Sequence, residues 1–365
     1  MRHQEIIRRL VVHYRLKKNM TQEDLARRLY IDRSLISRFE NGKRSLSSDM
    51  SRDIFDVLNI NLSIDEKCLS RYDTLFEELY LRVIKSDKDG AKEFSDKLDN
   101  WKDEILASID RYRYYLYISF YKSYLRELDD IEVLRLFDYE AFYDDEDRQL
   151  LYTEMGKMYY WKEKNDEAEK WLNKAIEINP GNLRSTMCKY YMIKIFSDRD
   201  KHYEAYILLH DCIKTFMKYD IKAKAVNCIE MLAIIHIRTK QYAAAANIFS
   251  SLLKKHAKRS KDIKRLTNSL LWALIEKGDR QGAYHLITKN LDDPKFLNYR
   301  TLSSITYFAC MNDDGELIDR CTQTYDKIDD HNDICELMSE YFIACQRRYL
   351  LKAKKIYRTL FPLLQ

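Results

Sequence analysis

The residues with the clearest chemical signature lie on one face of a short helix predicted between Asp32 and Asn41. Leu35, Ile36 and Phe39 fall at helical spacing and predict the buried face of this helix. The outward positions carry hydrogen-bonding residues: Arg33, Ser34, Ser37 and Arg38. The major groove of DNA admits one α-helix, and Arg and Ser side chains hydrogen-bond to the base edges exposed there. The pattern therefore predicts contact with double-stranded DNA.

A second short helix, predicted from Thr21 onward, positions the first. Thr21 suits the N-cap, and Asp24 three residues later forms a shorter variant of the capping box. The apolar positions of this helix share one face: Leu25, Ala26 and Leu29. Residues 30–32 make the turn between the helices, and Gly42 ends the second one, because glycine is the usual left-handed helix cap.

The stretches TQEDLA, SLIS and FENGKR resemble the Xre/Cro-type helix-turn-helix of phage repressors, over about residues 3–60. The resemblance implies that four residues face bases: Arg33, Ser34, Ser37 and Arg38. It implies that three others bind backbone phosphate: Gln22, Lys43 and Arg44. Tyr30 stands in the turn where the family often has glycine. A non-glycine residue in the left-handed conformation is strained, so we expect the turn to differ locally at Tyr30.

Charge is distributed unevenly along the 365 residues. The chain carries a net +5, whereas residues 1–47 hold twelve Lys and Arg against five Asp and Glu, a net +7 that leaves −2 for the remainder. A basic N-terminal region on a nearly neutral body favours nucleic-acid binding by that region alone.

Composition predicts an all-α protein of the reduced cytoplasm. Seven glycines and three prolines interrupt the chain rarely, which favours helices throughout. The eight cysteines show no C-x-x-C spacing, and we expect most of them to be small core residues. The N-terminus lacks the pattern of a signal peptide, and no apolar run approaches a membrane span. No phosphate-binding glycine loop, nucleophile set or metal-ligand spacing stands out, so we expect no cofactor and no enzyme.

Beyond about residue 66 the sequence predicts a series of amphipathic helices with short turns. Residues 149–182 match the tetratricopeptide spacing at Tyr152, Met155, Gly156, Tyr159, Ala168, Leu172, Ala175 and Pro180. The small residue at Ala168 recurs in degenerate units at Ala205, Ala245, Ala283, Cys321 and Ala353. Small residues let paired helices approach closely, and stacked pairs form a solenoid. We therefore expect a right-handed solenoid of seven or eight helical hairpins.

The first helix of each hairpin lines the inner face of such a solenoid. In the first clear unit the inward positions include Thr153, Lys157 and Tyr160. In later units we predict a peptide-binding set at Tyr190, Lys194, Asn227, Glu230, Arg265, Asn268 and Trp272. An Asn amide donates to and accepts from one peptide unit at once, and Lys or Arg binds a carboxylate. A solvated inner face with no ligand is the alternative.

The order of helix-turn-helix, short connector and tetratricopeptide solenoid resembles the RRNPP group of regulators, of the PlcR, NprR, Rgg and PrgX types. The resemblance implies a DNA-binding domain over residues 1–62 and a repeat domain over residues 63–365 for peptide sensing and dimerisation. It implies a homodimer on a palindromic operator, controlled by a short signalling peptide held by Asn227 and Asn268. One alternative is a phage- or plasmid-type repressor whose solenoid binds a protein antirepressor. A Rap-type regulator of a response regulator is another, which the helix-turn-helix disfavours.

Two further stretches have structural interpretations. Residues 111–124, RYRYYLYISFYKSY, predict a core helix packed on both sides, with a dimer face or an aromatic peptide groove as alternatives. The acidic run Asp144–Asp147 predicts a solvated loop rather than a metal site.

Overall fold

The computed structural model describes residues 2–256, 260–291, 298–325, 333–347 and 350–360. Regular structure in these ranges is helical, apart from one isolated bridge between Ser63 and Ser108. The chain forms two compact units, Met1–Ala225 and Val226–Gln365. The predicted all-α fold is confirmed. The predicted boundary after residue 62 lies inside the N-terminal unit and stays a prediction.

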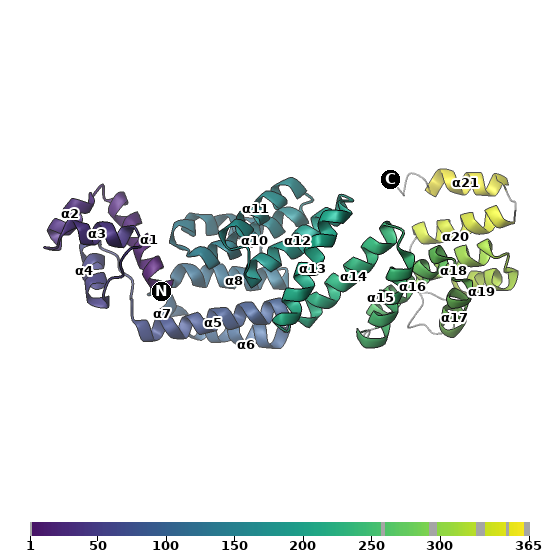
Figure 1. Ribbon diagram of the computed structural model, residues 1–365, viewed down its shortest axis with the longest axis horizontal. Coiled ribbons are helices and arrows are strands. Elements are labelled where there is room, and N and C mark those ends of the chain that lie inside the picture. The colour runs from purple at the N-terminus through teal and green to yellow at the C-terminus, as the bar shows by residue number, and fades with distance from the viewer. Residues whose placement is uncertain (1, 257–259, 292–297, 326–332, 348–349, 361–365) are drawn as a thin grey trace. The chain divides into compact units, whose positions relative to one another are not determined.

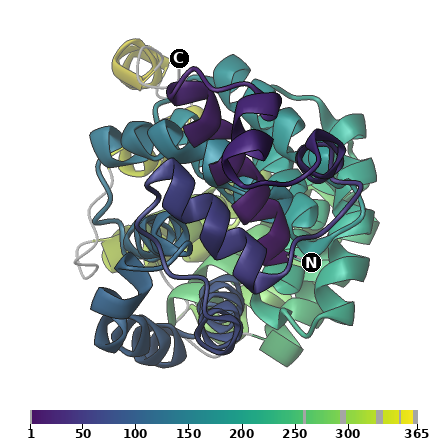
Figure 2. The same ribbon diagram turned by 90° about the vertical axis from the view of Figure 1, so that its left-hand side faces the viewer.

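Four helices make up the first 58 residues, which we call the head. They are α1 (Arg2–Lys17), α2 (Gln22–Arg28), α3 (Arg33–Glu40) and α4 (Ser48–Leu58) (Figures 1 and 2). Thr21 and Asp24 form the predicted capping box at α2, Asp32 caps α3 and Ser47 caps α4. A core of buried apolar side chains joins the four helices: Ile6, Leu10, Val11, Leu25, Ala26, Ile36, Phe39, Ile54, Phe55 and Leu58.

The turn after α2 keeps the left-handed conformation that a glycine would adopt. Tyr30 has φ +54°, and its side chain is 96% exposed. The local departure predicted at Tyr30 is therefore wrong. The turn requires this torsion, although the left-handed conformation costs a non-glycine residue about 1–2 kcal/mol of conformational energy. Gly42 ends α3 at φ +70°, as predicted.

Helices continue in the N-terminal unit as an antiparallel series. They are α5 (Glu66–Lys85), α6 (Lys88–Asn100), α7 (Lys102–Leu106), α8 (Arg111–Leu125), α9 (Asp130–Arg135), the 3₁₀ helix η1 (Leu136–Phe142), α10 (Asp145–Trp161), α11 (Asn165–Ile178), α12 (Leu183–Asp198) and α13 (His202–Lys218). Helices α5, α8, α10 and α12 form one layer, because α8 contacts α5 and α10, and α10 contacts α12 (Figure 1).

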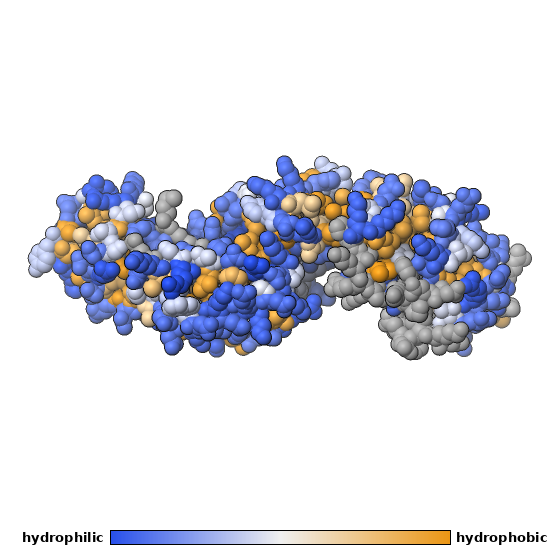
Figure 3. Space-filling view, turned by 90° about the horizontal axis from the view of Figure 1, so that it is seen from below, coloured by the Kyte–Doolittle hydropathy of each residue, from blue (hydrophilic) through white to orange (hydrophobic). Residues whose placement is uncertain are grey.

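Helix α14 (Lys222–Arg238) contains the boundary between the two units. The C-terminal unit continues with α15 (Tyr242–His256), α16 (Ser260–Lys277), α17 (Arg280–Asn290), α18 (Tyr299–Met311), α19 (Gly315–Tyr325), α20 (Asp333–Gln346) and α21 (Leu350–Leu360). Its core runs through successive helices, with Phe249 of α15 and Leu266 of α16 in one cluster and Ile287 of α17 and Leu302 of α18 in another. Hydrophobic atoms on the face seen in Figure 3 form small patches among hydrophilic ones. Among the described helices none has both the length and the apolarity to cross a membrane.

The small residues predicted at the hairpin contacts are all buried. Ala168, Ala205, Ala245, Ala283 and Cys321 are 0% exposed, and Ala353 is 5% exposed. Gly156 of α10 is placed even closer to its partner helix, since a Cβ atom there would lie 2.6 Å from Leu172 Cδ2. The repeat spacing therefore correctly identified positions at which small residues are buried.

Replacing Gly156 by alanine is expected to destabilise the N-terminal unit. The added methyl group overpacks the α10–α11 contact at a cost of about 1–3 kcal/mol, against about 1 kcal/mol returned by better helix propensity. A lower urea midpoint by circular dichroism is the expected result. Gly181→Ala is the control, since a Cβ atom there meets nothing within 4 Å. Equal midpoints for both variants would contradict this account of Gly156.

One prediction about local structure is corrected. The run Asp144–Asp147 is not a solvated loop: Asp144 caps α10, and Asp147 is fully buried against Arg113. Asp65 caps α5 by accepting from Lys67 N and Cys68 N. Ser63, shortly before it, exchanges backbone hydrogen bonds with residues 107 and 109.

Candidate functional site

Helix α3 presents hydrogen-bonding side chains to solvent, as predicted. Arg33, Ser34 and Arg38 are exposed and Ser37 is half-buried. Ile36 and Phe39 are buried, whereas Leu35 is only half-buried, so the predicted inward face is narrower than expected. The set Arg33, Ser34, Ser37 and Arg38, which we call the base-contacting face after its predicted role, is turned to solvent, and its contact with DNA stays a prediction.

Two pairs within α3 and its cap order this face in the absence of DNA. Arg38 Nε donates to Ser34 O at 3.2 Å, and Arg38 Nη2 donates to Ser34 Oγ at 3.3 Å. Asn41 Nδ2 donates to Ser37 O at 2.8 Å. The guanidinium of Arg38 therefore lies back along the helix and must swing outward to reach a base edge.

The residues predicted to bind phosphate differ in availability. Lys43 and Arg44 are exposed beyond the left-handed Gly42. Gln22 is half-buried, and its Nε2 donates to Glu40 Oε2 at 2.8 Å. This contact ties α2 to α3, so phosphate binding by the Gln22 side chain requires that bond to be exchanged. The three phosphate contacts stay predictions.

A buried ion pair joins the end of α3 to α1 within the head. Arg15 Nε and Nη2 donate to the two carboxylate oxygens of Glu40 at 2.6 and 2.8 Å. Arg15 is 8% exposed, and its Nη1 donates to Met20 O at 2.6 Å. Fork-to-fork pairing of this kind adds geometric specificity as well as energy. It anchors the C-terminal end of α3 and so orients the base-contacting face.

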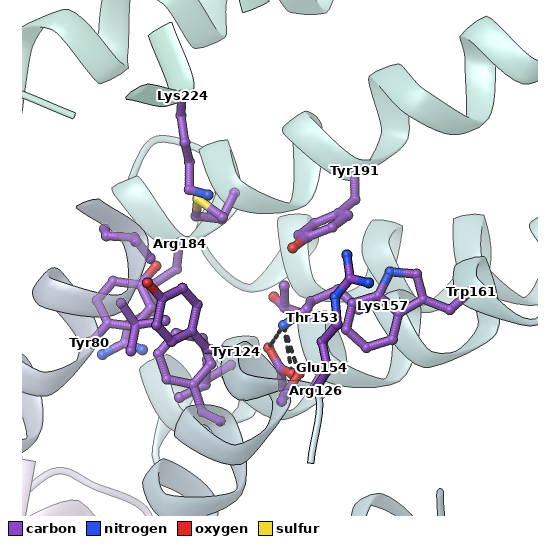
Figure 4. Close-up of a pocket in the computed structure, with 16 residues that line it drawn as sticks. Tyr80, Tyr124, Arg126, Thr153, Glu154, Lys157, Trp161, Arg184, Tyr191 and Lys224 are labelled. Atoms are coloured by element: carbon purple, nitrogen blue, oxygen red, sulfur yellow. Dashed lines mark hydrogen bonds and ion pairs between the residues drawn. The ribbon is translucent and has the colours of Figure 1, made fainter. Parts of the chain in front are cut away.

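A pocket opens among the inner helices of the N-terminal unit. Its walls come from α5, α8, α10 and α12, with Lys224 from the start of α14, and the space measures about 700 Å³ including the part open to solvent. Thr153 and Lys157, two positions predicted to face inward, line it. Figure 4 shows this pocket with the side chains that line it.

Aromatic rings and a buried ion pair form the centre of this pocket. Lys157 Nζ donates to both carboxylate oxygens of Glu154, at 2.7 and 2.8 Å, and to Ser123 Oγ at 3.0 Å. The same ammonium lies 5.5 Å from the ring of Trp161 and 5.8 Å from that of Tyr191. Glu154 is thus neutralised in place by Lys157.

The remaining charged side chains give the pocket a positive character. Its other cations are Arg126, Arg184 and Lys224, of which Arg184 pairs with Glu77, and Glu154 is the one acid among the lining residues. Burial raises the pKa of the Tyr80 and Tyr191 hydroxyls, so both stay neutral. A ligand with an acidic group and apolar side chains matches this environment.

Two of the predicted peptide-binding residues lie in the N-terminal unit. Tyr190 is 6% exposed, and Lys194 Nζ lies 4.9 Å from its ring centroid. Lys224 Nζ lies 5.2 Å from the same ring. Tyr190 is therefore a packing platform for two ammonium groups next to the pocket rather than an open surface for an apolar side chain.

The other five predicted residues lie in the C-terminal unit, and four of them contact neighbouring side chains. Arg265 pairs with Glu230, which is 8% exposed. Asn268 Oδ1 accepts from Ser304 Oγ at 2.9 Å, and the ring of Trp272 lies 5.7 Å from that of Tyr307. A ligand carboxylate at Arg265 has to displace Glu230. Asn227 is exposed on α14, and the binding role of all five stays a prediction.

Sequence reasoning missed the pocket walls contributed by α5 and α8. Residues 111–124 form a largely buried helix, as predicted, but Phe120 and Tyr124 also line the pocket. Part of this helix therefore lines a pocket, and the aromatic peptide groove stays a prediction. The available signal was the aromatic density of α8, since Tyr80 and Arg184 carry no distinctive local pattern.

Comparison with known proteins supports the helix-turn-helix at the N-terminus and the helical fold over most of the chain. The helix-turn-helix family matches residues 13–64. No curated protein sequence matches the chain. Among solved structures, the apo form of the quorum sensor NprR from B. thuringiensis superposes with a TM-score of 0.61 at 15% identity, covering 80% of this chain and 92% of that one.

Two ligand-bound structures have the same fold. NprR in complex with its cognate peptide NprX gives a TM-score of 0.54 at 16% identity, covering 81% of this chain and 89% of that one. A Rap protein complexed with Competence and Sporulation Factor gives 0.55 at 11% identity, covering 80% and 87%. The chain therefore has a helix-turn-helix domain at its N-terminus and, over most of its length, the fold shared by NprR and Rap.

Proposed function

We propose that the protein is a sequence-specific DNA-binding transcription regulator controlled by a short peptide bound on the concave face of its helical repeats. One observation carries the proposal: a single compact unit contains both an exposed Arg and Ser helix face and a concave, positively charged aromatic pocket. The first feature suits base edges, and the second suits a small amphipathic ligand.

Binding to DNA is proposed to use two copies of the head. A homodimer inserts two α3 helices into successive major grooves about one helical turn apart, which requires a palindromic operator. Lys43, Arg44 and Gln22 contact phosphate and make the affinity dependent on salt. The base-contacting face supplies the sequence preference.

Control by peptide is proposed by analogy with structures of the same fold that hold peptide or signalling-factor ligands. The pocket accepts apolar side chains against Phe120 and Trp161 and an acidic group near Arg126 or Lys224. A ligand shifts DNA binding only if it has different affinities for the two conformations. The chain itself acts as a receptor and not as an enzyme.

Operator selection tests the DNA-binding part. Duplexes enriched from a random pool should converge on one palindromic sequence, which the protein should bind at least 1,000-fold tighter than unrelated DNA, about 4 kcal/mol. The logarithm of the affinity should fall linearly with the logarithm of salt concentration. A pool that fails to converge, with equal affinity for all duplexes, removes the proposal.

Asn227→Ala and Asn268→Ala are expected to weaken peptide binding without changing the fold. Each variant removes an amide able to donate to and accept from one peptide unit, at about 1 kcal/mol or roughly fivefold in affinity. Calorimetry against peptides encoded by short exported reading frames beside the gene measures the change. Wild-type affinity in both variants removes these residues from the groove and leaves the pocket of the N-terminal unit as the site.

A further inference from the structure

Residues on the outer face of α1 hold the head against α5, the start of α8 and η1. His3 Nε2 lies 3.1 Å from Asp73 Oδ2 of α5 and 3.9 Å from Asp110 Oδ2, just before α8. The ring of His13 meets that of Phe142 edge-on, with centroids 4.8 Å apart. These contacts use the side of the head away from α3, and the base-contacting face stays exposed while the head is docked.

The carboxylates that hold His3 belong to a buried charge cluster. Arg113 of α8, which is 1% exposed, has Nη1 2.5 Å from Asp73 Oδ1 and 3.0 Å from Asp110 Oδ1. Its Nε lies 3.2 Å from Asp147 Oδ2. Although burial raises the pKa of Asp73, the hydrogen bond from His3 and the charge of Arg113 hold that pKa well below its usual range. The carboxylate of Asp73 is therefore ionised at neutral pH.

Arg113, rather than a metal ion, supplies the positive charge of this cluster. His3, Asp73 and Asp110 place ligand atoms within 4.8 Å of one another, a spacing that a metal ion accepts. The guanidinium already contacts both carboxylates, and a divalent cation beside it is strongly disfavoured by like-charge repulsion. The three residues therefore serve as a docking contact for the head.

A continuous line of side chains joins this cluster to the pocket. The guanidinium of Arg113 lies 4.6 Å from the ring of Phe76 and 5.8 Å from that of Tyr117, and the two rings are 4.9 Å apart. Tyr117 Oη donates to Glu77 Oε1 at 3.2 Å. The line thus runs between α5 and α8 with no gap in its contacts.

Arg184 of α12 closes the line at the pocket end. Its Nη2 donates to Glu77 Oε1 and to Tyr117 Oη, both at 2.8 Å, and its guanidinium lies 4.2 Å from the ring of Tyr80. Arg184 is 5% exposed, its Nη1 has no hydrogen-bond partner among the described residues, and both Arg184 and Tyr80 line the pocket. The same arginine therefore contacts the pocket and ties α5 to α8.

We propose that the occupant of the pocket controls how firmly the head is docked, through the line Arg184–Tyr117–Arg113–His3. The inference rests on the proposed function for the identity of the occupant as a peptide. His3 bridges carboxylates from two helices, so its fit depends on the spacing of α5 and α8. Arg184 helps to set that spacing, and an occupant that draws Arg184 or Tyr80 aside loosens the contact at His3. Packed interiors transmit such shifts because they do not deform smoothly.

Chemical footprinting of His3 tests the proposal in the full chain without DNA or peptide. Diethyl pyrocarbonate modifies accessible imidazole, and mass spectrometry gives the rate at His3 relative to the exposed His285. Tyr117→Phe removes one hydroxyl from the line. Arg184→Lys keeps the positive charge but removes the planar guanidinium that contacts Glu77 and Tyr117. Both variants should raise the rate at His3 at least threefold. Asp73→Asn, which weakens the contact between His3 and α5, gives the modification rate for a loosely docked head.

The matched control is Tyr191→Phe, which removes a pocket hydroxyl beside Lys157, outside the line, and should leave the rate at His3 unchanged. Wild-type rates in both Tyr117→Phe and Arg184→Lys, with circular dichroism unaltered, overturn the proposal. Should Arg184→Lys fail to fold, the result for Tyr117→Phe decides alone. Because the footprint needs no operator, a failed operator selection and a failed footprint are independent results.

Discussion

Replacing Arg38 by alanine is expected to remove most of the preference of the protein for its operator while leaving the fold intact. Arg38 is exposed on α3, and its hydrogen bonds go only to Ser34 of the same helix among the described contacts. A bidentate Arg–base contact is worth about 1–3 kcal/mol of discrimination. In a dimer the loss occurs twice, about 2–6 kcal/mol, which is a large part of the margin of about 4–10 kcal/mol between specific and non-specific binding.

Fluorescence anisotropy with the selected operator and with an unrelated duplex measures this change. The matched control is Arg27→Ala, because Arg27 is an exposed arginine on α2 whose side chain is 73% exposed and which lies off the base-contacting face. The control should weaken binding to both duplexes similarly, whereas Arg38→Ala should weaken only operator binding strongly. Unchanged operator affinity in Arg38→Ala would exclude α3 as the recognition helix.

Glu40→Ala is expected to destabilise the head severely. The substitution leaves the guanidinium of Arg15 buried with Met20 O as its remaining partner among the described contacts, and it also frees the amide of Gln22. Breaking a buried pair by removing one partner costs about 3–5 kcal/mol, which is a large share of the stability of a small domain.

Denaturant unfolding followed by circular dichroism, together with operator binding, reports the effect. The expected results are an early transition for the head and loss of operator binding. Asp49→Ala is the control, because the Asp49–Arg52 pair is on the surface with both side chains largely exposed, and surface pairs contribute little. A Glu40→Ala variant as stable as the control would show that the Arg15–Glu40 pair does not hold α3 in place.

The features predicted correctly from the sequence are those fixed by short-range geometry. Thr21 caps α2 because its hydroxyl reaches an amide three residues away, and Gly42 ends α3 because its torsion is local. The small residues at hairpin contacts are predictable for a similar reason, because each one recurs at the same position of the repeat. Ala168 and Ala283 were therefore identified without any knowledge of their partners.

Features that depend on distant partners were missed. Asp147 was assigned to a solvated loop because its partner Arg113 lies 34 positions earlier in the chain. Arg184 meets Glu77 across 107 residues, so neither showed a recognisable motif. The prediction at Tyr30 is wrong for a different reason. The left-handed torsion is strained for a tyrosine, as expected, but the turn enforces that torsion nevertheless.

The same limit applies to the predicted peptide-binding residues. Repeat spacing indicates which helix face a residue occupies, but it does not indicate whether a neighbouring helix supplies a partner. Glu230 and Arg265 lie on adjacent inner helices and neutralise each other. Side chains on α5 and α8 contribute much of the pocket, and those helices fall outside the recognisable repeats.

Reciprocal titration of operator and peptide tests the central claim most directly. Operator affinity is measured by anisotropy with and without saturating amounts of each peptide encoded by short exported reading frames beside the gene, and peptide affinity is measured with and without operator. The account predicts that one peptide changes operator affinity by about 5- to 150-fold and that operator changes the affinity for that peptide by the same factor. Equal operator affinity with every peptide bound at saturation would contradict it.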